Sequence, residues 1–342
     1  MNSNRRYVRL VASIGIPIVL FLALVSPVAA QGLSARAANS DSGVPSFQHI
    51  FVIMMENTSY SSLIGNSNAP WINKAAATDG LAKNYTGVAH PSQPNYIAAT
   101  SGSTNTVTND NDVTIDVPNI VDQLETNGKT WKAYMQSLSL CPGSNPLTHA
   151  CGNQLYERKH DPFVSYADVQ SSPARMANIV DFSQFATDLA NNTVPNYSWI
   201  SPDQCNDMHG RFSTDPNDLC SFSHEQQLIA AGDAFLKSTV KQIMNSSAWQ
   251  DSNSVIFITW DESDFPFGDT SGCCDAVPGA GGGHVVTLAI SSENDTERTS
   301  NVAYNHYSLL ATVEDAWNLG CLVFTCDTAN VKPMSDLVNQ NG

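Results

Sequence analysis

Four short, mostly apolar runs constrain the fold of this chain more than any other feature of its sequence. Each run has four to six residues, which is the length of a strand rather than of a helix, and carries apolar side chains on both faces. Strands that are apolar on both faces are typical of parallel sheets that helices cover on both sides. We therefore predict buried strands at Ile50–Met55, Tyr197–Ile200, Val255–Trp260 and Val285–Ile290.

Apolar residues recur with helical spacing between and after these runs, most clearly over residues 226–249 and 306–319. Strands that alternate with helices predict an α/β fold with a mostly parallel central sheet and helices on both faces. We expect a single domain over residues 47–342. Residues 141–175 and 263–283 are poorly periodic and contain Cys, Pro and Gly, so we expect them to form loops over a site.

The first thirty residues have the pattern of an export signal. Three arginines precede the mostly apolar stretch Leu10–Val25, and small residues suit cleavage after Ala30. The alternative is a transmembrane anchor, but the stretch is short and is interrupted by Ser13, Gly15 and Pro17. We predict a signal peptide over 1–30, a flexible leader over 31–46, and a protein that is secreted or held in the periplasm or cell envelope without a stable membrane anchor.

The chain is strongly acidic. It has 16 Lys and Arg against 32 Asp and Glu, which gives a net charge of −16. Binding to nucleic acid needs a basic surface, so we expect no nucleic-acid partner. An acidic chain does not attract anions over long range either, so any anionic ligand must be held by local cations.

The eight cysteines all follow the predicted signal, and an even number in an exported protein favours disulfides. A zinc site is the alternative, but no Cys-x-x-Cys pair occurs. Cys273 and Cys274 are adjacent and would be strained if joined to each other. Short loops favour the pairs Cys141–Cys151, Cys205–Cys220 and Cys321–Cys326.

Acidic and polar side chains follow three of the predicted strands. In an open parallel sheet, ligands bind in the crevice outside the carboxyl ends of the strands. Negative charge crowded there has to be neutralised, which favours one divalent metal ion. For any single strand the alternative is a helix N-cap. The side chains are Glu56 and Asn57 after the first strand, Asp203, Asp207 and His209 after the second, and Asp261 and Glu262 after the third.

Ser92 is the candidate nucleophile. Pro94 favours the first turn of a helix, so Ser92 stands just before a helix N-terminus, where free N–H groups and the helix dipole favour an anion. A hydroxyl there can attack phosphorus if a metal lowers its pKa; the alternative is that Ser92 is only an N-cap. A serine esterase and a nucleotide-binding P-loop are disfavoured, because neither Gly-x-Ser-x-Gly nor Gly-Lys-Ser/Thr occurs.

Six short segments stand in one order along the chain: Phe47–Tyr60, His90–Tyr96, Arg158–Phe163, Asn206–His209, Thr259–Glu262 and His306–Leu310. Each segment alone is a weak signal. Together they cover most of residues 46–320 and resemble the bacterial phosphoesterase family, which contains secreted acid phosphatases and phospholipases C. That family is related to the alkaline phosphatase superfamily, so the resemblance implies an alkaline-phosphatase-like fold.

The resemblance also implies roles for individual residues. One divalent metal ion, of open identity, would be held by Glu56, Asn57, Asp261 and Glu262. Ser92 would be the nucleophile, Asn95 would help to hold a phosphoryl oxygen, and Lys159 and His160 would steady the phosphate charge or protonate the leaving oxygen. Further polar or metal-linked groups would be Asp207, His209 and His306. His284 is a further candidate, with a loop histidine beside a strand as its alternative.

We therefore expect a secreted, metal-dependent phosphomonoesterase of the acid phosphatase type, which acts through a phosphoserine on a phosphoinositide or another organic phosphate monoester. The block His90–Tyr96 resembles small secreted acid phosphatases, some of which are described as phosphatidylinositol-3-phosphatases. The chain also stops soon after Leu319, without the added C-terminal domains of the larger phospholipases. The alternatives are a phospholipase C-type phosphodiesterase and a non-catalytic envelope protein that binds ligands on the same scaffold.

Overall fold

The computed structural model describes Met1 and residues 42–264, 269–274, 281–293 and 297–339. The signal peptide and most of the leader fall outside the described residues and stay predictions. Contacts divide the chain into residues 1–32 and 33–342, and the predicted domain falls inside the second unit. Within the described ranges, no helix is long and apolar enough to cross a membrane.

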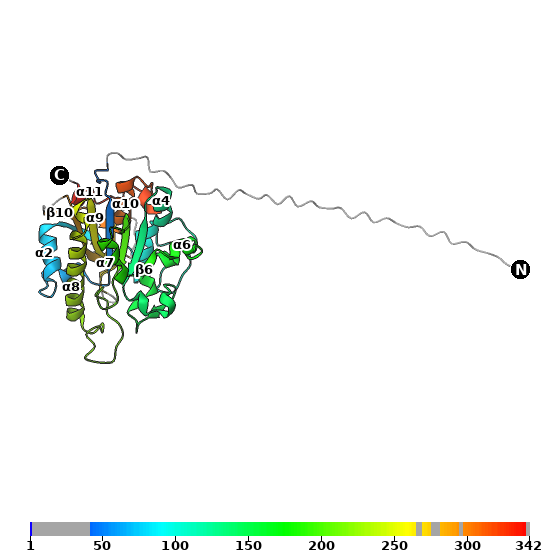
Figure 1. Cartoon of the computed structure of the whole chain (residues 1–342), viewed down its shortest axis with the longest axis horizontal. Coiled ribbons are helices and arrows are strands. Elements are labelled where there is room, and N and C mark those ends of the chain that lie inside the picture. The colour runs from blue at the N-terminus through cyan, green and yellow to red at the C-terminus, as the bar shows by residue number, and fades with distance from the viewer. Residues whose placement is uncertain (2–41, 265–268, 275–280, 294–296, 340–342) are drawn as a thin grey trace. The chain divides into compact units, whose positions relative to one another are not determined.

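A nine-stranded sheet forms the centre of the fold (Figure 1). Its four middle strands are the four predicted ones. β1 (His49–Met55) is parallel to both β7 (Tyr197–Ser201) and β8 (Ser254–Trp260), whereas β9 (His284–Ser291) runs antiparallel to β8. The predicted α/β fold with a mostly parallel sheet is confirmed, with β9 as an antiparallel insertion.

The outer strands are shorter or more polar. β2 pairs with β9, β10 and β11 pair with β2, and on the other side β3 pairs with β7 and β6 with β3. A separate hairpin is formed by β4 and β5. The bounds are Gly80–Thr86 (β2), Trp131–Met135 (β3), Ala150–Cys151 (β4), Tyr156–Glu157 (β5), Ile179–Asp181 (β6), Arg298–Ser300 (β10) and Tyr304–Asn305 (β11).

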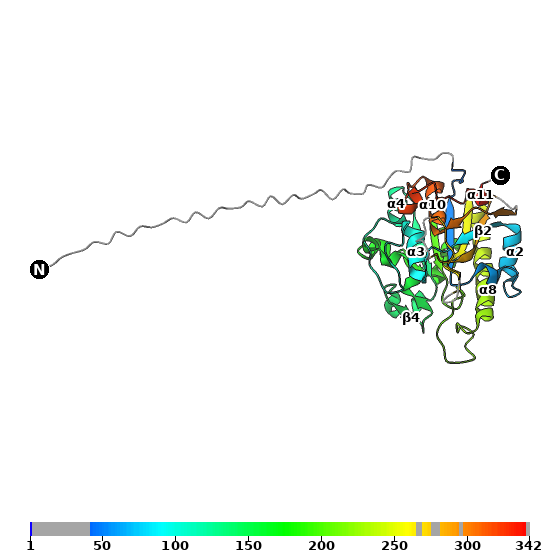
Figure 2. The ribbon, with the colours of Figure 1, turned by 180° about the vertical axis from the view of Figure 1, so that it is seen from behind.

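Helices cover both faces of the sheet. Figure 1 shows α7 and α8 over one face, and Figure 2, from behind, shows α3 over the other; α10 packs on α3, and α2 packs on α8. The α-helices are α1 (Tyr60–Leu63), α2 (Pro70–Thr78), α3 (Ser92–Ser101), α4 (Ile120–Thr126), α5 (Ala167–Gln170), α6 (Pro173–Met176), α7 (Ser183–Ala190), α8 (Glu225–Met244), α9 (Ser247–Gln250), α10 (His306–Trp317) and α11 (Ser335–Val338). Short 3-10 turns are η1 (Leu138–Leu140), η2 (Pro142–Ser144), η3 (Arg158–His160), η4 (Phe163–Ser165) and η5 (Val323–Cys326).

The helix α3 lies deeper than a surface helix, because all ten of its residues are buried. It ends at Gly102, whose φ of +73° suits glycine and whose ideal Cβ would lie 2.1 Å from the carbonyl oxygen of Leu322. The segment that contains Leu322 therefore packs directly against the end of the helix. This close packing fixes α3, and with it the position of Ser92 at the other end.

All eight cysteines are paired. The three predicted short-loop disulfides, Cys141–Cys151, Cys205–Cys220 and Cys321–Cys326, are present. The expectation that the adjacent Cys273 and Cys274 stay apart is wrong, because the structure joins them. Cys274 has a φ of +58°, and this left-handed turn brings the two neighbouring side chains together.

Candidate functional site

The carboxyl ends of β1, β7 and β8 meet at one edge of the sheet, as predicted. β1 and β8 are paired to their last residues, so Glu56 and Asp261 follow on neighbouring strands. The Asn57 N–H donates to Asp261 Oδ1 (3.0 Å), and the Asn57 side-chain amide donates to Glu262 Oε1 (2.9 Å). The Glu56 N–H donates to the carbonyl of Asp207, behind β7 (2.9 Å). Side chains about 200 residues apart therefore form one cluster.

The Ser92 hydroxyl points into this cluster from the first turn of α3. It is buried and lies 3.0 Å from Glu56 Oε2, 3.4 Å from Asn57 Oδ1 and 3.4 Å from Glu262 Oε1. The Lys159 ammonium, which lies in η3, is 3.4 Å from the same oxygen. A single hydroxyl thus stands between the acidic residues and the partly buried ammonium of Lys159.

The Asp110 carboxylate lies at the start of α3, a contact that no sequence pattern predicted. The Gln93 N–H donates to Asp110 Oδ1 (3.0 Å), and Lys159 pairs with Asp110 Oδ2 (3.0 Å). A carboxylate is therefore held by the helix N-terminus and by the lysine, which are two groups that also suit a phosphate.

His160 lies between two carboxylates. Its Nε2 is 3.2 Å from Glu56 Oε1 and its Nδ1 is 3.6 Å from Asp207 Oδ2. The Tyr96 ring stacks on the imidazole, and its hydroxyl donates a short hydrogen bond to the same Glu56 oxygen. The Ser201 hydroxyl donates to the His160 carbonyl (2.8 Å), so the end of β7 fixes the backbone of this histidine.

Burial and charge divide the acids of the cluster. Burial alone would raise the pKa of Glu56, but the neighbouring His160 and Lys159 lower it to about 2. Burial, together with the charge of Glu56, holds the pKa of both Asp207 and Asp261 well above the ordinary value. The charge of Glu56 therefore disfavours the ionised forms of Asp207 and Asp261, and a bound cation would relieve that repulsion.

The oxygen donors suit a hard divalent cation. Asp261 Oδ2 is buried and has no hydrogen-bond partner, although a buried carboxylate oxygen normally has one. Among the described residues, no group of three or more His, Cys, Asp and Glu side chains is already arranged around a metal position. A cation here would draw on amide and hydroxyl oxygens as well, and metal dependence stays a prediction.

Asn95 holds the loop before α3 instead of pointing at the Ser92 hydroxyl. Its Oδ1 accepts from the N–H groups of Val88 (2.9 Å) and Ala89 (3.1 Å), and its Nδ2 donates to the carbonyls of Ala89 (2.8 Å) and Pro91 (3.3 Å). Both ends of the amide are used by the backbone. Asn95 therefore positions the turn that carries Ser92, and its contact with a phosphoryl oxygen stays a prediction.

His209 lies beside the cluster. Its N–H donates to Asp207 Oδ1 (2.8 Å), its Nδ1 donates to the Gly210 carbonyl (2.6 Å), and its ring centroid is 6.3 Å from that of His160. Burial, followed by the charge of Lys159, lowers the pKa of His209 to about 4. This imidazole is neutral at pH 7.

The other two predicted histidines have different positions. His306 is fully buried: its Nε2 donates to the Asp261 carbonyl (2.6 Å), and its Nδ1 accepts from the Tyr85 hydroxyl (3.0 Å). It supports the backbone of a candidate ligand. His284 is not brought into the cluster, because its ring stacks on Tyr60 and its Nε2 lies 3.0 Å from the Lys83 carbonyl.

Sequence reasoning missed two further contacts of the cluster besides Asp110. The His90 Nδ1 forms an ion pair with Glu262 Oε2, and this pairing outweighs burial and raises the pKa of His90. Tyr96 donates to Glu56. Both residues belong to the segment that suggested Ser92, and helical spacing alone puts Tyr96 one turn beyond Ser92.

The burial of His306 predicts an acid-sensitive fold. Burial lowers its pKa to about 4, whereas the unfolded chain has the ordinary value of about 6.5. Between these values the unfolded state binds more protons, so the free energy of unfolding falls as the pH falls from 6.5 towards 4. We expect a loss of about 2 kcal/mol from this group between pH 7 and pH 5.

Urea denaturation at both pH values measures this loss. His306→Gln keeps a donor for Asp261 and an acceptor for Tyr85 but does not titrate. We expect its pH dependence to be smaller than that of the wild type by about 2 kcal/mol. Equal pH dependence in both proteins would show that His306 is not held neutral.

Comparison with known proteins places the chain among phosphoesterases. The sequence model described as "Phosphoesterase family" matches residues 66–320, a range that begins after Glu56 and Asn57. A probable acid phosphatase of Kluyveromyces lactis is 28% identical over 309 residues, which are 86% of this chain and 65% of that protein. An acid phosphatase of Aspergillus fumigatus is 30% identical over 281 residues, 81% of this chain and 56% of that protein. This chain thus spans less than two thirds of either protein.

A relative of similar length also matches. It is the phosphatidylinositol-3-phosphatase of Mycobacterium tuberculosis, 28% identical over 336 residues, which are 97% of this chain and 95% of that protein. Solved structures with the same fold include an alkaline phosphatase superfamily protein of Vibrio parahaemolyticus (TM-score 0.53, 13% identity, 82% of this chain and 69% of that chain). The phosphonate monoester hydrolase of Agrobacterium radiobacter is a second (TM-score 0.52, 12% identity, 84% and 78%). At these identities the likeness shows the fold alone, and it confirms the expected alkaline-phosphatase-like fold.

Proposed function

Because the chain belongs to the phosphoesterase family, we propose that it is an exported, metal-dependent phosphomonoesterase that uses Ser92 as its nucleophile. The position of the Ser92 hydroxyl carries this proposal. It stands at the N-terminus of a buried helix, 3.4 Å from Lys159 and 3.0 Å from Glu56. A hydroxyl between a cation and acidic residues has the surroundings that nucleophilic attack on a phosphate needs.

Substrate binding would use Lys159 and the first turn of α3. The carboxylates of Glu56 and Asp110 outweigh burial and raise the pKa of Lys159, so its ammonium stays charged. A phosphate that approaches Ser92 competes with Asp110 for the same lysine and for the Gln93 N–H. These groups would hold the phosphate oxygens while the phosphorus faces the hydroxyl.

The first step would form a bond between Ser92 Oγ and phosphorus as the ester bond breaks. The hydroxyl proton would pass to a carboxylate that it already contacts. Glu262 Oε1 is the better acceptor at 3.4 Å, because burial raises the pKa of Glu262, whereas that of Glu56 is lowered to about 2. A divalent cation held by Glu56, Asn57, Asp261 and Glu262 would neutralise phosphate charge and lower the pKa of the attacking hydroxyl.

His160 would donate a proton to the leaving alkoxide. Its two ring nitrogens face the carboxylates of Glu56 and Asp207, whereas His209 has a pKa of about 4 and is neutral at pH 7. In the second step His160 would take a proton from water as that water attacks the phosphoserine. The bond from Ser92 to phosphorus then breaks, Glu262 returns its proton to the Ser92 oxygen, and inorganic phosphate leaves.

The substrate would be a phosphate monoester of an organic alcohol, with a phosphoinositide as the first candidate. Support comes from the relative that matches over nearly its whole length, which is described as a phosphatidylinositol-3-phosphatase. A chromogenic phosphomonoester assayed beside the matching phosphodiester tests the proposal. We expect phosphate release from the monoester at a rate at least about tenfold above that from the diester; the reverse preference would favour a phospholipase C-type enzyme. No release from either would favour a non-catalytic binding protein.

Removal of divalent cations is expected to lower the phosphomonoesterase rate by about 100-fold or more, because a metal that stabilises charge in the transition state contributes several kcal/mol. The rate is measured after exhaustive chelation and after separate additions of calcium, magnesium, zinc, manganese and iron. At least one ion is expected to restore it. Far-ultraviolet circular dichroism controls for unfolding, and full activity in a chelated, folded sample would contradict metal dependence.

A further inference from the structure

The loops at the carboxyl edge of the sheet expose an unusual number of apolar side chains. Of the nine large apolar side chains that are exposed in the described part of the chain, five lie on two loops. One loop follows β7 and continues to α8, and the other surrounds the β4–β5 hairpin. The five residues are Phe212 (65% exposed), Leu219 (60%), Phe222 (55%), Leu140 (54%) and Leu147 (38%).

Both loops project at the same end of the molecule as the candidate site. Figures 1 and 2 show the segment between β7 and α8 extending beyond the sheet at the end where α8 begins, and β4 at the same end. Phe212 follows His209 by three residues, so their Cα atoms lie within about 11 Å. The β4–β5 hairpin leads directly into η3, which carries Lys159 and His160. The apolar side chains therefore flank the site.

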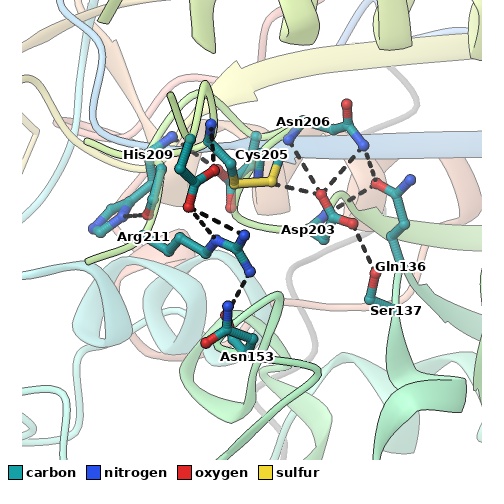
Figure 3. The surroundings of a disulfide bond; sticks show 12 residues. Gln136, Ser137, Asn153, Asp203, Cys205, Asn206, His209 and Arg211 are labelled. Atoms are coloured by element: carbon teal, nitrogen blue, oxygen red, sulfur yellow. Dashed lines mark hydrogen bonds and ion pairs between the residues drawn. A yellow bond between two sulfur atoms is a disulfide. The ribbon is translucent and has the colours of Figure 1, made fainter. Parts of the chain in front are cut away.

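The two loops are tied together and to the scaffold. Figure 3 shows the Cys205–Cys220 disulfide and Arg211, whose Nη1 donates to the Asn153 carbonyl (3.0 Å) on the β4–β5 hairpin. Arg211 also pairs with Asp218 (3.1 Å). Next to Asn153, the ideal Cβ of Gly152 would lie 2.6 Å from Leu140, so this exposed leucine packs against the β4–β5 hairpin.

The base of the longer loop is fixed as well. Figure 3 shows Asp203 accepting from Ser137 (2.7 Å) and from the Asn206 side chain (3.2 Å). Next to the backbone bridge between Arg211 and Ser221, Phe212 and Phe222 lie beside each other, with ring centroids 6.1 Å apart. The two aromatic rings thus stand on a loop that a disulfide and hydrogen bonds hold in place.

We propose that these two loops dock the protein on the surface of an uncharged or zwitterionic lipid bilayer, so that the candidate site faces phosphate esters carried by that bilayer. This inference rests on the proposed function. Large apolar side chains that are exposed side by side, as the rings of Phe212 and Phe222 are, mark an interface with a protein or a membrane. Here the same loops carry the site residues Lys159, His160, Asp207 and His209, so the occupant has to admit substrate to the site. A bilayer that contains the substrate does so, whereas a protein partner seated on these loops would cover the entrance.

The charge of the protein selects the kind of bilayer. The chain carries a net charge of −16, and the exposed Asp215 lies in the same loop as the two aromatic rings. Anionic lipids would repel this surface, so apolar insertion is expected to be strongest with phosphatidylcholine and weaker when an anionic lipid is added.

Vesicle sedimentation tests the proposal with the purified protein and vesicles of phosphatidylcholine. We expect the wild type to sediment with the vesicles and the double variant Phe212→Ser/Phe222→Ser to partition about tenfold less or lower still. The matched control is Met244→Ser/Val323→Ser, which removes two exposed apolar side chains outside the two loops. Met244 is the last residue of α8, and Val323 is the first residue of η5, which contacts Gly102 after the end of α3. We expect this control to bind as the wild type does.

Two activity assays separate docking from catalysis. The rate on a soluble chromogenic phosphomonoester is expected to stay within about twofold in the Phe212/Phe222 variant, since neither ring contacts the cluster. The rate on a phosphomonoester lipid in phosphatidylcholine vesicles is expected to fall with the partition. A wild type that hydrolyses no soluble monoester overturns the proposed function, whether or not it binds vesicles.

Three results would overturn the docking proposal. The first is a wild type that does not sediment with phosphatidylcholine vesicles. The second is a double variant that binds them as well as the wild type does. The third is a wild type that is a dimer and becomes a monomer on the same double substitution, which would assign the loops to a second copy of the chain.

Discussion

Ser92→Ala is expected to lower kcat/KM for a phosphomonoester by about 1,000-fold or more. The substitution removes the oxygen that attacks phosphorus, and loss of a nucleophile typically costs several orders of magnitude because the remaining groups cannot form the covalent intermediate. Steady-state hydrolysis of a chromogenic phosphomonoester measures the effect. Acid-quenched wild type is also expected to carry a phosphoryl group on the peptide that contains Ser92, and the variant is expected to carry none.

The fold is expected to tolerate this change. The Ser92 hydroxyl donates to Glu56, but that carboxylate keeps the Tyr96 hydroxyl and His160 as partners, so we expect the free energy of unfolding to change by about 1 kcal/mol or less. The matched control is Ser101→Ala, at the other end of the same buried helix, where the hydroxyl donates to the Ile97 carbonyl. Its activity is expected to stay within about twofold of wild type. Full activity in Ser92→Ala would remove this residue from the mechanism.

The strands that could be predicted from the sequence are the ones that the fold buries on both faces. β1 and β8 are apolar along their length because helices cover both sides of them, and their pattern therefore identifies them. β2 contains exposed Lys83 and Asn84, and β6 has only three residues, so neither carries a recognisable period. Outer strands were missed because exposure and short length remove the signal that burial creates.

The acidic part of the candidate site was predictable for a topological reason. Residues that follow parallel neighbouring strands have to meet, so Glu56 and Asp261 needed only correct strands to be placed together. Asp110 carries no such constraint. It lies in a segment without periodicity, 18 residues beyond Ser92, and only the folded chain returns it to Lys159 and to the start of α3.

Asn95 and His284 show the limit of carrying roles over by position. Asn95 belongs to the correct segment, but its amide is used by the backbone of Val88 to Pro91. His284 is the first residue of β9, the strand that follows Asp261 and Glu262 along the chain. Its ring nevertheless stacks on Tyr60. A residue at a matching position is expected to lie near the candidate site. Its role depends on which side-chain atoms are free to bind a ligand after the contacts within the protein are made.

Asp261→Asn is expected to lower the activity and, without metal, to raise the stability of the fold at pH 7. The Asp261 carboxylate is fully buried, its Oδ2 has no partner, and burial with the charges of Glu56 and Glu262 raises its pKa well above the ordinary value. A carboxyl with a raised pKa costs stability above the pKa of the unfolded chain, near 4, and the cost disappears as the pH falls through that value. In the absence of metal, the isosteric amide is therefore expected to stabilise the fold at pH 7 by about 1–3 kcal/mol and to have little effect near pH 3.5.

The matched control, Asp188→Asn, is expected to change the stability at pH 7 in the opposite direction. Asp188 accepts from Lys132 (2.6 Å) and Tyr134 (2.8 Å), and these bonds outweigh burial and lower its pKa. Asp188→Asn is expected to destabilise the fold at pH 7 by about 1 kcal/mol, with the effect fading at low pH. Thermal unfolding of both variants in chelator, at pH 7 and near pH 3.5, measures the two signs.

The activity of Asp261→Asn and the response of its Tm to metal test whether Asp261 binds the cation. If its unpartnered oxygen binds the divalent cation, Asp261→Asn is expected to lower kcat/KM by about 100-fold or more and to abolish the rise in Tm that the cation gives the wild type. The stabilisation in chelator and the lost response to metal then have one cause, because a buried charge that destabilises the empty site is the charge that the cation neutralises. An Asp261→Asn protein that is less stable than wild type in chelator, yet still gains Tm with metal, would contradict that cause and assign the cation to other side chains.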